Sequence, residues 1–111
     1  MVKDDAFELY DLKVEVKLEP GMEMGCNHSE GSVFFVQGEN VIFPKGGSFP
    51  FYSLSSLMSL LAVKQRFTVE HDWISTDHIV ACPDPLCGGR FHIHRMNKRK
   101  FYHHQVTLNN S

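Results

Sequence analysis

An alternating stretch between Leu12 and Leu18 constrains the fold of this chain more than any other feature. Every second residue in this stretch is apolar, and a lysine or a glutamate stands between each apolar residue and the next. The apolar residues are Leu12, Val14, Val16 and Leu18. A period of two is typical of a β-strand that has one buried and one solvated face. The sequence therefore predicts a sheet that is wet on one side.

Further segments predict the rest of this sheet. Each is short, apolar and bounded by Gly, Pro or Asn, and Gly38 marks a hairpin turn between the first two. The segment 67–73 is expected to be extended as well. The short predicted strands are 32–36, 41–43, 79–81 and 90–95.

One helix is predicted after the third strand. Ser48 is expected to be its N-cap, and Lys64 and Arg66 lie at its C-terminal end, where cations suit the helix dipole. The apolar residues recur at helical spacing and predict a face that packs on the sheet. They are Phe51, Leu54, Leu57, Met58 and Leu61.

The element order predicts the fold class α+β, a small, mainly antiparallel sheet with one covering helix. The 111 residues, 42% of them hydrophobic and nine of them Phe, suit one folded domain. This single domain is expected to span residues 1–96. Residues 97–111 are expected to form a C-terminal tail that either adds a last strand or frays.

Charge and composition restrict the partners and the compartment. A net charge of −2 gives no general attraction to nucleic acid or to anionic membranes. The start of the chain lacks the apolar region of a secretory signal, and the longest apolar run, 60–63, is too short for a membrane span. Three cysteines cannot all pair within the chain. We therefore expect a cytoplasmic protein with reduced thiols, and a homodimer through an exposed strand edge.

Cysteine and histidine clusters are the strongest chemical feature. Cys26 and His28 form a C-x-H pair, and Cys82 and Cys87 form a C-x4-C pair. Together they would give Cys3His, a closed tetrahedral set typical of structural zinc. The spacings differ from those of a standard zinc knuckle. The alternative is that these cysteines are small buried residues without a metal.

A second arrangement involves His92 and His94. On a strand both imidazoles lie on one face, close enough to share a metal. The third ligand would be His28, Asp84 or Glu30, which leaves an open position for a Lewis acid or a bound hydroxide. The alternative is that the two imidazoles simply lie on the solvated face.

These residues support two functional hypotheses. The first is a small enzyme of the lyase, isomerase or hydrolase type that acts on a small organic molecule. His28, Asp84 and His92 would be catalytic, and one transition metal, zinc or iron, would be the cofactor. The second is a non-catalytic metal-stabilised or partner-binding module. A closed Cys3His site favours the module, and a His-only site with a water ligand favours the enzyme.

Three segments of the chain, 26–34, 50–57 and 81–85, together resemble a family of short proteins found as single or tandem copies. The resemblance covers Tyr10 to about Arg95, and Ala-Cys-Pro-Asp-Pro at 81–85 is its most specific part. Members of that family carry a cysteine four residues before the histidine, where this chain has Met24. Only Cys82 matches a family cysteine in place. The resemblance implies no established reaction, and it informs the fold more than the function.

Overall fold

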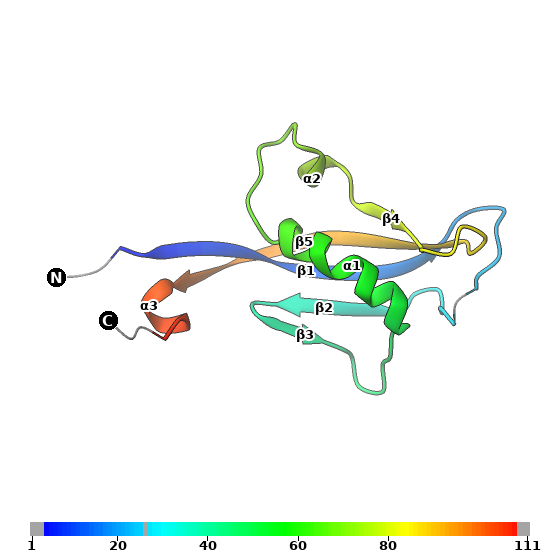
Figure 1. Ribbon diagram of the computed structural model, residues 1–111, viewed down its shortest axis with the longest axis horizontal. Helices are drawn as coiled ribbons and strands as arrows, with labels where there is room; N and C mark the ends of the chain where they lie inside the picture. Colours follow the sequence, from blue (N-terminus) through cyan, green and yellow to red (C-terminus); the bar gives the residue numbers. More distant parts are fainter. Residues whose placement is uncertain (1–3, 26, 109–111) are drawn as a thin grey trace.

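The computed structural model describes residues 4–25 and 27–108, and its centre is a five-stranded antiparallel sheet. The strand order is β3-β2-β1-β5-β4, so the two longest strands lie in the middle (Figure 1). This architecture confirms the predicted α+β class. The strands are β1 Ala6–Leu18, β2 Val33–Gln37, β3 Asn40–Ile42, β4 Ile79–Ala81 and β5 Gly89–Tyr102, and the helices are α1 Phe51–Lys64, α2 Trp73–Thr76 and α3 His103–Val106.

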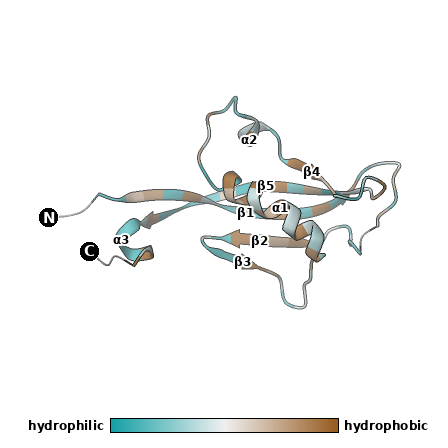
Figure 2. Cartoon of the chain, viewed as in Figure 1, coloured by the Kyte–Doolittle hydropathy of each residue, from teal (hydrophilic) through white to brown (hydrophobic). Residues whose placement is uncertain are grey.

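The central pair β1 and β5 follows the predicted alternation. Val14 lies opposite Ile93 and Val16 lies opposite Phe91, and all four side chains are buried. The intervening residues of both strands are more exposed, and Figure 2 shows hydrophobic and hydrophilic positions alternating along the strands. His92 therefore lies on the face opposite the core, as predicted.

The strand β5 continues beyond the expected end at Arg95. A register shift interrupts its pairing with β1 between Tyr10 and Leu12, and pairing then resumes from Lys98 to Tyr102. These paired ends form a two-stranded arm that projects from the sheet, and the molecule is elongated, with extents of 60 × 35 × 22 Å (Figure 1). Residues 98–102 are therefore part of the sheet and not of a tail.

The helix α1 covers one face of the sheet, as predicted, but with a different set of residues. Leu57 and Leu61 are buried, whereas Phe51 and Met58 are exposed, so their predicted place on the core face is wrong. The N-cap is Pro50, without a side-chain hydrogen bond, and not Ser48. The main core consists of Leu12, Val14, Val16, Phe34, Val36, Leu57, Leu61, Cys82, Cys87, Phe91 and Ile93.

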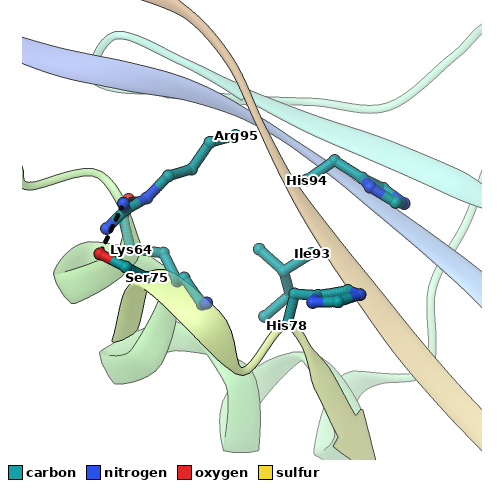
Figure 3. Close-up of a pocket in the computed structure, with 6 residues that line it drawn as sticks. All are labelled: Lys64, Ser75, His78, Ile93, His94 and Arg95. Atoms are coloured by element: carbon teal, nitrogen blue, oxygen red, sulfur yellow. Dashed lines mark hydrogen bonds between the residues drawn. The ribbon is translucent and has the colours of Figure 1, made fainter. Parts of the chain in front are cut away.

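The segment between α1 and β4 is held by two cations. The Lys64 side chain is buried, and its ammonium donates hydrogen bonds to the carbonyl oxygens of Ile74 and Asp77. Arg95 donates to the carbonyl oxygen of Lys64 at 2.9 Å and approaches Ser75 Oγ at 3.5 Å (Figure 3). The segment 67–73 is therefore a turn-rich connection to α2 and not the extended segment predicted. Within the described residues, no helix is long and apolar enough to cross a membrane.

Lys64→Met is expected to lower the free energy of unfolding by about 1–3 kcal/mol, because two carbonyl groups lose their donor in a buried place. Burial also lowers the pKa of Lys64 below its usual value, so the ammonium already bears a desolvation cost. Urea unfolding measures the change. Lys45→Met, at an exposed position, is the matched control. An unchanged unfolding midpoint in Lys64→Met would show that these hydrogen bonds contribute nothing net.

Candidate metal centre

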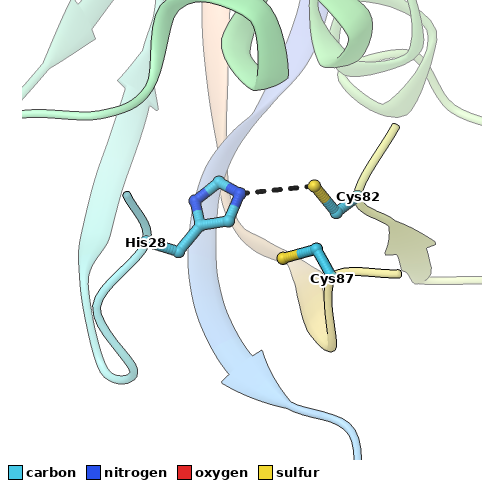
Figure 4. A group of neighbouring side chains, drawn as sticks. All are labelled: His28, Cys82 and Cys87. Atoms are coloured by element: carbon cyan, nitrogen blue, oxygen red, sulfur yellow. Dashed lines mark hydrogen bonds between the residues drawn. The ribbon is translucent and has the colours of Figure 1, made fainter. Parts of the chain in front are cut away.

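Three predicted metal ligands meet at one end of the sheet. His28, Cys82 and Cys87 each offer a ligand atom, and these atoms all lie within 4.8 Å of one another. All three residues are buried. Figure 4 shows both sulfur atoms on the same side of the imidazole, with His28 on the loop after β1 and the cysteines at either end of the loop between β4 and β5. This buried group could hold a metal ion.

The loop between β4 and β5 places both cysteines through its backbone. The N–H of Cys82 donates to the carbonyl oxygen of Gly89 at 3.1 Å, which closes the base of the loop. At the tip, the Asp84 carbonyl accepts from the N–H of Cys87 at 3.0 Å, and its carboxylate accepts from the N–H of Leu86 at 3.0 Å. The C-x4-C spacing is therefore a compact turn that directs two sulfur atoms toward one point.

The imidazole of His28 is held by aromatic rings. Its centroid lies 5.1 Å from that of Phe91, edge to face, and 5.9 Å from that of Phe49. Its Nε2 lies 3.5 Å from Cys82 Sγ and 3.2 Å from Ser53 Oγ. Among the described residues its Nδ1 is buried without a hydrogen-bond partner, so the protein contacts leave part of this imidazole's capacity unused.

Electrostatics also suit a metal at this point. Burial lowers the pKa of His28 below its usual value, which favours the neutral imidazole that binds metals. Cys87 Sγ accepts backbone N–H groups from Gly25 at 3.1 Å and from Gly89 at 3.4 Å. Backbone donors directed at a sulfur atom stabilise the charge of a thiolate, the form that ligates metals.

The spacing of the atoms agrees with tetrahedral zinc. With Zn–S near 2.3 Å and Zn–N near 2.0 Å, adjacent nitrogen and sulfur ligands are about 3.6 Å apart. The distance from His28 Nε2 to Cys82 Sγ is 3.5 Å. All three ligand atoms lie within 4.8 Å of one another, an upper bound that is looser than this ideal.

Two glycines allow the loops to approach closely. A Cβ at Gly89 would lie 3.1 Å from His28 Cδ2 and 3.4 Å from Cys87 Sγ. A Cβ at Gly88 would lie 2.6 Å from Met22 Cβ and 2.9 Å from the Glu23 carbonyl oxygen, a clash with backbone that cannot relax cheaply. The packing of the site therefore requires glycine at both positions.

The remaining predicted site residues are distributed differently. Cys26 lies outside the described residues. His92 and His94 lie on the open face of the sheet, whereas His28 packs on Phe91 on the covered face, so a metal shared by His28 with these two histidines is ruled out by the sheet between them. The carboxylate of Glu30, another predicted third ligand, accepts a hydrogen bond from the backbone N–H of Leu18 at 3.1 Å and does not join the two histidines.

Two residues contact these groups in a way that was not predicted. Ser53 lies on the buried face of α1 and contacts the His28 imidazole, and only the position of α1 on the sheet reveals this. His78 lies beside His92 and His94, with ring centroids 6.3 and 6.4 Å away. Antiparallel pairing of 79–81 with 90–92 could have indicated this neighbour, had the register been known. Burial, with Lys17 and the two histidines, lowers the pKa of His92.

A cavity of about 390 Å³ adjoins the metal centre on the side of α1. Its volume falls in the range of small-molecule pockets. The cavity borders the site through Cys82 and Ser53, and the exposed ring of Tyr52 forms part of its wall. It is lined by Pro50, Tyr52, Ser53, Cys82, Pro83 and Asp84.

Comparison with known proteins gives no further constraint. No protein family, no curated protein and no solved structure matches this chain. The family resemblance drawn from segments 26–34, 50–57 and 81–85 therefore stays a prediction, and the function has to be argued from the site.

Proposed function

We propose that this protein is a small zinc-stabilised module, in which the metal joins the loops at one end of the sheet. One observation supports this above all: the ligand atoms of His28, Cys82 and Cys87 lie within 4.8 Å of one another in a buried position. The loops that carry them are far apart in sequence. A single ion would therefore fix a long-range contact, and its binding free energy would add to the stability of the fold.

The fourth ligand in this proposal is Cys26, which lies outside the described residues. The choice rests on the chain itself: the preceding Gly25 donates its N–H to Cys87 Sγ at 3.1 Å, and His28 follows two residues later. Cys3His is a closed tetrahedral set without an open position for a substrate. The role of the metal is then structural, and no catalytic turnover at this site is expected.

A second candidate is a small metal-dependent enzyme, and the cavity beside Cys82 is the observation that favours it. With only His28, Cys82 and Cys87 as protein ligands, the fourth position would be open, as in catalytic Cys2His zinc sites. The metal would then polarise a carbonyl or activate a water molecule. A small organic substrate in the cavity would contact Ser53 and Asp84, and the reaction would be of the lyase, isomerase or hydrolase type.

The number of sulfur ligands separates the two candidates. For the zinc-loaded protein we expect X-ray absorption at the zinc edge to show three sulfur ligands near 2.3 Å and one nitrogen near 2.0 Å. Cys26→Ser should reduce the sulfur count to two and weaken zinc binding at least about tenfold, because a ligand is lost. Ser29→Ala, at an exposed position in the same loop, is the control and should change neither.

Each other outcome has a defined meaning. Two sulfur ligands in the unmodified protein, with no change in Cys26→Ser, would reject the closed site and favour the enzyme. Protein that stays folded and binds no zinc in a direct titration would reject both candidates. The titration should be made under reducing conditions, since oxidised cysteines do not ligate zinc.

A further inference from the structure

Three histidines, a residue type that commonly ligates metals, lie together on the open face of the sheet. His92 and His94 project from β5 on the side opposite α1, and His78 reaches the same place from the residue before β4. The hydrogen bond from the N–H of Ile93 to the carbonyl oxygen of His78, at 2.8 Å, fixes this neighbour against β5. In Figure 3 the rings of His78 and His94 point to the same side, away from Arg95 and Ser75.

The three imidazoles form a nearly equilateral triangle. The ring centroids are 6.3 Å apart for His78 and His92, 6.4 Å for His78 and His94, and 6.3 Å for His92 and His94. Three imidazoles on one ion, with metal–nitrogen bonds near 2.0 Å, have centroids about 5 to 5.5 Å apart. Each centroid would therefore move by less than about 1 Å, and a side-chain rotation would turn one nitrogen of each ring toward the ion.

A hydrogen bond to the backbone orients the imidazole of His78. His78 Nδ1 lies 3.2 Å from the carbonyl oxygen of Thr76. A carbonyl can only accept, so a neutral imidazole in this contact would carry its proton on Nδ1 and offer Nε2 as the ligand atom. An imidazole that donates one N–H to a backbone carbonyl and ligates through the other nitrogen is the usual arrangement at metal sites.

The carboxylate of Glu15 lies beside these histidines. Glu15 lies opposite His92 in the register of β1 and β5, and its Oε1 is 4.0 Å from His94 Nε2. A negative charge at this distance would offset part of the charge of a divalent ion. It could also serve as a fourth ligand after a side-chain rotation.

We infer that His78, His92 and His94, with Glu15 beside them, form a second metal site that takes a divalent late transition ion such as zinc. It is separate from the buried centre, because the sheet lies between the two. Three imidazoles from the protein leave at least one position for water or an exchangeable ligand, so this site should bind more weakly and exchange faster than a closed centre. The inference does not depend on the role proposed for His28, Cys82 and Cys87.

Zinc titration tests the inference, and it is followed at the imidazoles so that the result does not depend on zinc at the buried centre. Nuclear magnetic resonance above pH 7 should show the signals of His78, His92 and His94 shifting together, and where the buried centre is loaded, calorimetry should show a second, weaker equivalent. His78→Gln should weaken zinc binding at this site at least about tenfold, since a ligand is lost. His71→Gln, an exposed histidine away from the triangle, is the matched control and should leave it unchanged.

Several results would overturn the inference. These are the absence of zinc-dependent shifts at the three imidazoles, equal affinities of His78→Gln and His71→Gln at this site, or shifts confined to other histidines. His94→Gln repeats the test from the strand, so a folding defect in one variant cannot mask the result. Loss of the first equivalent in the cysteine variants, with the second retained, would instead bear on the buried centre alone.

Discussion

If zinc binds as proposed, Cys87→Ser is expected to lose zinc binding and to lower the melting temperature of the zinc-loaded protein by more than about 10 °C. Cys87 is 2% exposed, receives two backbone N–H groups at its sulfur and lies on one of the two loops that the metal would join. An ion present at a thousandfold excess over its dissociation constant stabilises the folded state by about 4 kcal/mol. In a domain of this size each kcal/mol corresponds to about 4 °C or more.

The measurement is thermal unfolding of the zinc-loaded protein with and without a strong chelator. We expect the unmodified protein to melt early in the chelator, at nearly the temperature of Cys87→Ser, because both then lack the metal. Leu86→Ser introduces the same residue in the same loop at a position that is 85% exposed, and it should retain the metal and its stability. A chelator that leaves the unmodified protein unchanged would contradict a stabilising metal.

Phe91→Ala is expected to lower the free energy of unfolding by about 3–5 kcal/mol, the usual cost of removing a buried aromatic ring. Phe91 is 0% exposed, and its ring lies 5.5 Å from Phe49 and 5.1 Å from His28 between centroids. The cavity left behind would remove one wall that orients the His28 imidazole. A weaker zinc affinity should therefore accompany the loss of stability.

Urea unfolding in zinc and in chelator separates these two effects. The destabilisation by Phe91→Ala should be larger with zinc present, and the difference measures the coupling between the ring and the metal. Phe67→Ala removes a ring that is 70% exposed and should cost little. Equal destabilisation by Phe91→Ala in both conditions would show that the ring supports the core without orienting the ligand.

Local patterns were sufficient for much of the sheet. The alternation along 12–18 predicted β1 because side chains on a strand change face at every residue, whatever the rest of the chain does. The same rule correctly separated Phe91 and Ile93 from His92 and His94. The end of β5 could not be predicted in this way, since the polar residues 98–100 acquire their strand only by pairing with residues 8–10.

The candidate site also combines features that local sequence predicts with features that depend on distant parts of the chain. Residue types and spacing were sufficient to predict the chemistry, namely which side chains could ligate a metal and that Cys82 and Cys87 lie close together along the chain. The fold placed His28 with the two cysteines, which was one of its two predicted groupings, and it brought His78 to the other two histidines, which was not predicted. The physical reason is that ligand sets form between residues distant in sequence, and strand register and the packing of α1 decide which of them meet.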